Sequence, residues 1–65
     1  MTKSNAEIAL NRLMIEKIVQ SMVVRGETRT EELVAEIDSR YRPESEFEME
    51  EYSEAILYGK YSALN

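Results

Sequence analysis

The chain has 65 residues and a net charge of −5, with no cysteine, histidine or tryptophan. This length makes one domain, residues 1–65, near the lower size at which a hydrophobic core is stable by itself. The lack of cysteine and histidine excludes disulfides, thiolate or imidazole catalysis and the usual zinc sites, so oligomerisation is the remaining support for so small a fold.

The first predicted helix covers residues 5–24. Ser4 and Glu7 before it have capping-box spacing, in which the hydroxyl accepts from one backbone N–H and the glutamate reaches back to another. One face of this helix is apolar at helical spacing and is expected to enter the core. The residues of that face are Ile8, Ile15, Ile18, Val19 and Met22. Gly26 suits the left-handed turn that commonly follows a helix.

A second apolar face lies roughly opposite the first on the same helix and includes Leu10, Leu13 and Met14. Two apolar faces on one helix need two partners. Either the other two helices straddle the first helix, or a second copy of the chain covers this face. Our hypothesis is the second alternative, a homodimer whose interface includes Leu10, Leu13 and Met14.

The second predicted helix covers residues 29–41 and follows a second capping-box pair, Thr28 and Glu31. Apolar residues recur along it at spacings of three and four, namely Leu33, Val34, Ile37 and Tyr41. We expect Ile37 to lie in the core. Pro43 closes this segment, because proline disfavours helical geometry in the residue before it.

The third predicted helix covers residues 46–58 and follows the capping-box pair Ser45 and Glu48. Its inward stripe is predicted to be Met49, Tyr52, Ala55 and Ile56. Gly59 either ends this helix or only weakens it. Because strand signals are poor throughout, the sequence predicts an all-α, compact three-helix domain that dimerises.

Charge is unevenly distributed along the chain. Residues 1–25 carry a net charge of +2, and residues 26–65 carry −7. Six glutamates and no base lie between Glu44 and Glu54, a field that repels phosphate and attracts basic protein surfaces. The tyrosines of this half either pack in the core or form a surface patch suited to a protein partner. We predict a protein partner with a basic surface, bound through Glu48, Glu51, Glu54, Tyr58 and Tyr61.

No catalytic, cofactor-binding or metal-binding residues are predicted. The serines have no glycine-rich phosphate loop or nucleophile elbow beside them, and we assign Ser4, Thr28 and Ser45 to helix caps. Glutamate pairs at helical spacing could bind a hard cation, but a calcium-loop pattern is absent and such pairs usually form a solvated face. The absence of catalytic groups favours a non-enzymatic protein. We read neither a signal peptide nor a transmembrane span in the sequence, and we therefore expect a cytoplasmic location.

The run from Met14 to Ile37, a long amphipathic helix, a short turn and a second helix, resembles the first two helices of a winged-helix or helix-turn-helix module. That resemblance implies DNA binding through the next helix. The next helix, however, begins with glutamates, and no hairpin wing follows. We therefore predict a protein-interaction domain, as regulator, adaptor or assembly subunit. The alternative is a helix-turn-helix-like DNA-binding transcriptional regulator that would contact phosphates through Lys3, Arg12, Lys17 and Arg25.

Overall fold

The computed structural model describes residues 3–64 and contains three helices. They are α1 (Asn5–Val24), α2 (Thr30–Arg40) and α3 (Glu46–Leu64), and no strand occurs within the described range. The predicted all-α three-helix fold is confirmed. The first helix has the predicted bounds, the second is one residue shorter at each end, and the third extends beyond residue 58.

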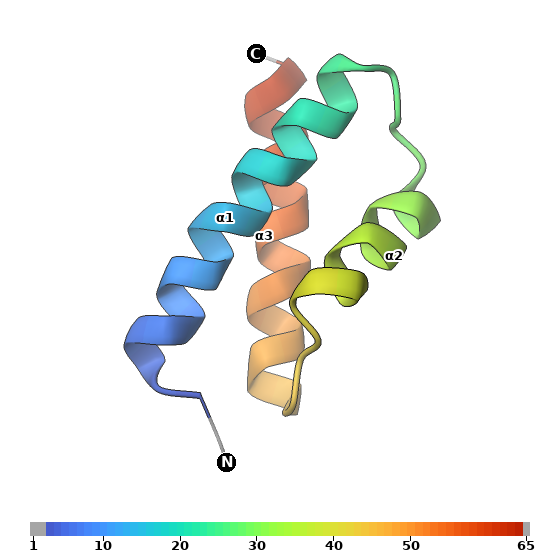
Figure 1. The fold of residues 1–65 in the computed structure, drawn as a ribbon. Helices are drawn as coiled ribbons and strands as arrows, with labels where there is room; N and C mark the ends of the chain where they lie inside the picture. Colours follow the sequence, from blue (N-terminus) through green and yellow to red (C-terminus); the bar gives the residue numbers. More distant parts are fainter. Residues whose placement is uncertain (1–2, 65) are drawn as a thin grey trace.

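The helices α1 and α3 lie side by side and point in the same direction, while α2 lies to one side of this pair and carries the chain back to the start of α3 (Figure 1). Contacts between the two long helices follow this parallel order: Arg12 bonds to Glu51, and Val19, further along α1, lies against Gly59. The α1–α3 contact is much more extensive than either helix's contact with α2. These two helices therefore form the body of the fold.

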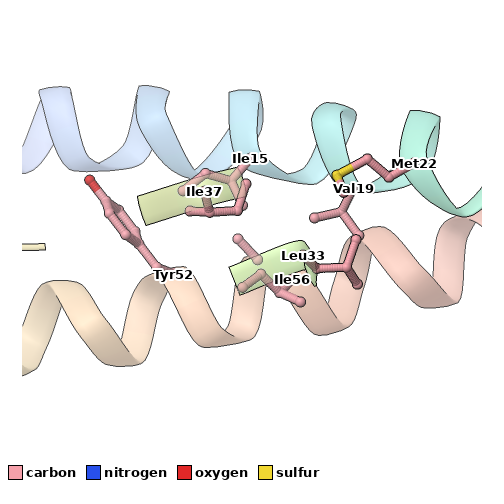
Figure 2. Packing of buried hydrophobic residues seen from close by; sticks show 8 residues of the cluster. Ile15, Val19, Met22, Leu33, Ile37, Tyr52 and Ile56 are labelled. Atoms are coloured by element: carbon pink, nitrogen blue, oxygen red, sulfur yellow. The ribbon is translucent and has the colours of Figure 1, made fainter. Parts of the chain in front are cut away.

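The core lies between α1 and α3 and is completed by α2. Side chains of α1 and α3 point toward each other, with Leu33 and Ile37 of α2 between the two ribbons (Figure 2). The core cluster consists of Ile15, Val19, Met22, Leu33, Ile37, Tyr52, Ala55 and Ile56. Ile15 and Ile37 are 0% and 2% exposed, which confirms both as core residues.

Met49 is 57% exposed, so its predicted place in the inward stripe of α3 is wrong. The buried position in this turn belongs to Glu48, which is only 2% exposed. Successive helical residues point about 100° apart, at 3.6 residues per turn. Because Glu48 faces the interior, Met49 is turned toward the surface.

Gly59 does not end α3, which continues to Leu64. The glycine is buried against α1, where an added Cβ would lie 2.7 Å from Val19 Cβ and 2.9 Å from the Glu16 carbonyl oxygen. Any side chain at this position would push the helices apart. Gly59 thus permits the close approach of α1 and α3.

Two of the three predicted serine or threonine caps are present. The Ser4 hydroxyl accepts from the Glu7 backbone N–H at 3.1 Å, and the Ser45 hydroxyl accepts from the Glu48 N–H at 3.2 Å. The Glu48 carboxylate reaches back as a capping box requires, but it accepts from the N–H of Glu44, at 3.2 Å. These bonds fix the starts of both long helices.

The predicted cap at Thr28 is wrong. Helix α2 begins at Thr30, with Arg29 in extended geometry before it and no side-chain cap bond. Instead, the negative charges of two glutamates in its first turn stabilise the start of the helix, because they lie at the positive end of the helix dipole. The predicted left-handed turn at Gly26 is confirmed by its φ of 92°.

Candidate functional site

Glu48 is the one polar or charged residue buried among residues 3–64, and it lies at the end of the bundle where α1 and α3 begin. Its carboxylate accepts from Lys3 Nζ at 2.9 Å and from the Tyr52 hydroxyl at 3.1 Å. Asn11 donates to the Tyr52 hydroxyl at 3.3 Å, and Lys3 also donates to the Arg42 carbonyl at 2.9 Å. This network joins the N-terminal segment to the loop between α2 and α3.

The bonds to the Glu48 carboxylate determine its protonation. Burial raises the pKa of Glu48, but hydrogen bonds from Lys3, the Glu44 backbone and Tyr52 outweigh burial and hold the pKa below its ordinary value. The bond to Glu48 in turn raises the pKa of the Lys3 ammonium. Both groups are therefore charged at neutral pH. The structure places Glu48 inside the fold, away from the predicted partner surface.

Glu48→Gln should lower the free energy of unfolding by about 1–3 kcal/mol near neutral pH, because it removes charge-assisted hydrogen bonds. Since the folded pKa is depressed, this contribution is present above about pH 4.5 and is lost as the pH falls through the folded value. Urea denaturation should show the two proteins converging in stability in acid. Glu50→Gln, the same charge change at an exposed side chain of α3 that forms no ion pair within the described residues, is the control and should show little difference at any pH. A constant gap between wild type and Glu48→Gln would contradict this role.

Arg12 links α1 to α3 near the middle of the bundle. Its guanidinium forms ion pairs with Glu51, with Glu54 at 3.4 Å and with Glu16 at 3.7 Å. The same group lies 5.3 Å from the centre of the Tyr58 ring, within the range of a cation–π contact. Arg12 and Glu51 are thus engaged inside the chain, whereas the Glu54 side chain remains 56% exposed.

The two tyrosines predicted to bind a partner lie on the surface of α3. Tyr58 is 54% exposed and Tyr61 is 67% exposed. Together with Glu54 and Leu57 they line a shallow hollow. The structure therefore brings together three of the five predicted partner-binding residues, Glu54, Tyr58 and Tyr61, in one exposed patch.

A second surface of α3 is acidic. Glu46, Glu50 and Glu54 are four residues apart, which places them on one side of the helix, and they line a depression together with Met49 and Ser53. We call these five residues the acidic face. Glu46 and Glu50 form no ion pair within residues 3–64. The acidic face thus presents unneutralised carboxylates beside an exposed methionine.

The predicted dimer interface on α1 is also uncovered. Leu10, Leu13 and Met14 are 59%, 57% and 44% exposed, so α2 and α3 do not straddle α1 in a way that buries them. The predicted homodimer stays a prediction.

Next to this surface, a basic groove runs between α1 and α2. Its three bases are Lys17, Arg25 and Arg40, and Glu36 is its single acid. Glu36 is already paired with Arg40 at 3.0 Å. The remaining residues of the groove are Met14, Ile18, Ser21 and Met22. Sequence reasoning missed this groove, because no local pattern shows that Arg40 of α2 returns beside α1.

Within the described residues 3–64, no group of three histidine, cysteine or acidic side chains is placed to hold a metal ion. None of the described helices combines the length and hydrophobicity needed to cross a bilayer. Comparison of the chain with protein-family models, with curated proteins and with solved structures gives no match.

Proposed function

We propose that the chain is a small, non-enzymatic, cytoplasmic protein-interaction domain, acting as a regulator, adaptor or assembly subunit through its helical surfaces. The exposure of large apolar side chains carries this proposal. Among residues 3–64, eleven large hydrophobic side chains are exposed, whereas eight large hydrophobic side chains are buried in the core. Neighbouring members on α1 and on α3 form patches of the kind that marks interaction sites.

The chemistry of α3 suggests the character of the partner. Tyrosines supply apolar area with a hydrogen-bonding tip, and Glu54 lies at the junction of the tyrosine patch and the acidic face. A complementary surface would be basic with apolar side chains among its charges. The partner surface proposed here comprises Glu50, Glu54, Tyr58 and Tyr61, and omits the buried Glu48.

Three of the four bases considered for DNA binding are paired within the chain, which favours a protein partner over DNA. Lys3 is bonded to Glu48, Arg12 is paired with three glutamates, and Arg25 is paired with Glu27 at 3.3 Å. The first turn of α3, which would approach the bases in a helix-turn-helix module, is acidic. Phosphate would be repelled from that surface.

Affinity capture from the source cells tests the proposal. Wild-type bait should retain a partner whose contact surface is basic, and a bait with Glu50→Gln and Glu54→Gln should retain less of it. Retention should also fall with added salt, because exposed charges are screened over about 8–10 Å at physiological ionic strength. The matched control bait, with Glu31→Gln and Glu32→Gln on α2, should retain the partner like wild type.

A mobility-shift assay with mixed-sequence duplex DNA tests the DNA-binding alternative. Specific retention of DNA at sub-micromolar protein, weakened by Lys17→Ala with Arg25→Ala, would favour the DNA-binding alternative. DNA binding would also strengthen when the glutamates of the acidic face are replaced by glutamine, whereas binding to a basic protein would weaken.

A further inference from the structure

We propose that the acidic face of one copy docks in the basic groove of a second copy, so that the chain associates head to tail. This inference rests on the proposed function, since it identifies the partner with a basic surface as another copy of this chain. The two surfaces lie on different helices of one molecule, the acidic face on α3 and the groove between α1 and α2. Both are therefore presented by every copy.

Charge complementarity is the first support for this docking. The groove carries three bases and one acid, and the acidic face carries three glutamates and no base. Lys17 forms no ion pair within the described residues, and neither does Glu46 or Glu50. Docking would oppose these unpaired charges.

The spacing of the charges also matches. Lys17 lies on α1, and Arg25, eight positions later, is the residue that caps the C-terminal end of this helix with helical backbone geometry, so the two are about 12 Å apart along the helix axis at about 1.5 Å per residue. Glu46 and Glu54 have the same separation on α3. Two helices laid alongside each other can therefore bring both ends of each surface into register, with Arg40 approaching from α2.

Apolar side chains accompany the charges on both surfaces. Met14 and Ile18 line the groove, and Met14 is 44% exposed. Met49 stands among the glutamates of the acidic face and is 57% exposed. Methionine adapts its shape to irregular gaps, so burying these side chains against each other would add apolar contact to the charge pairs.

Symmetric contacts between identical surfaces are less favourable. An α1-to-α1 contact would gather the bases of both copies, and an α3-to-α3 contact would gather the glutamates of both. Of these three arrangements, only α1 to α3 opposes unlike charges. Such a contact is heterologous, so a pair of copies leaves one groove and one acidic face free, and association continues unless a ring closes. A pair of copies is then the first step of a longer assembly, through a contact that shares only Met14 with the predicted homodimer interface.

A charge-swap experiment on the purified full chain tests this docking. The groove variant carries Lys17→Glu and Arg25→Glu, and the face variant carries Glu46→Lys and Glu50→Lys. In light scattering at low salt, wild type should show a mass above the monomer's 7.6 kDa that rises with concentration. Each variant alone should remain near the monomer mass, and an equimolar mixture of the two should regain association, because its surfaces are again complementary.

Two controls match the charge changes at other exposed positions. Arg29→Glu with Arg42→Glu repeats the change of the groove variant, and Glu31→Lys with Glu32→Lys repeats that of the face variant. Both controls should associate like wild type, and circular dichroism should show that all variants are helical. Association of wild type should weaken toward about 1 M salt, where the Debye length is about 3 Å.

Three results would overturn the docking. The first is a monomeric wild type at high micromolar concentration. The second is association that survives in both charge variants but is lost in Leu13→Lys, which would place the contact on the outer face of α1 alone. The third is a mixture of folded variants that stays monomeric. None of these results bears on capture of a different basic protein, which is measured with separate baits and decides the proposed function by itself.

Discussion

Truncation of Ile15 to alanine should lower the free energy of unfolding by about 2–5 kcal/mol. Ile15 is 0% exposed and belongs to the cluster in which α1, α2 and α3 meet. Alanine would remove buried methyl and methylene groups and leave a cavity that the surrounding helices fill only in part. A domain of this length has a total stability of about 3–10 kcal/mol, at about 0.05–0.15 kcal/mol per residue. Ile15→Ala should therefore remove a large share of it.

Thermal and urea unfolding followed by circular dichroism measure this effect. Ile37→Ala, at 2% exposure, should behave similarly. Leu64→Ala, which removes apolar groups from a side chain 73% exposed, should change stability little and serves as the control. An unchanged melting temperature in Ile15→Ala would mean that the core lies elsewhere.

Periodicity and capping chemistry predicted the helices well, because both are local. The apolar spacing around Ile15 marks a core-facing stripe, and the hydroxyls of Ser4 and Ser45 accept from the expected N–H groups. The same spacing at Thr28 led to a wrong cap. A matching pair does not fix the backbone, and here Arg29 takes the position before α2.

Features that depend on distant residues could not be read from the sequence. Glu48 was assigned to a partner surface because it lies in an acidic run. In the fold it is buried, and its carboxylate accepts a hydrogen bond from Lys3, 45 residues earlier in the chain. The burial of Glu48 also turned Met49 outward. The basic groove likewise depends on how α2 returns beside α1. The tyrosine patch required no such information, because a short stretch of one helix places Tyr58 and Tyr61.

The role of Gly59 in the structure differs from the role that the sequence suggested. In an exposed helix, glycine is about 1 kcal/mol less favourable than alanine, so the sequence suggested a weak point or an end. In the fold, the missing Cβ allows α1 and α3 to approach closely around Val19 and the Glu16 carbonyl. The two effects of replacing Gly59 by alanine have opposite signs.

We expect the packing effect to exceed the helix-propensity effect. The nearest atoms to an added Cβ are a Val19 Cβ at 2.7 Å and a backbone oxygen at 2.9 Å, and neither can move without shifting α1. Overpacking of this kind typically costs about 1–3 kcal/mol. Gly59→Ala should therefore lower stability despite its better helix propensity, and Gly59→Val should lower it further.

Ser53, an exposed residue of the same helix, gives the reference for this test. At position 53, alanine should be more stable than glycine by about 1 kcal/mol, because only helix propensity differs. At position 59 the order should reverse, with glycine more stable than alanine in urea unfolding. If alanine were more stable at both positions, α1 and α3 would not be in the close contact that Gly59 permits. The reversal would instead show that the parallel packing of α1 and α3 depends on the absence of one side chain.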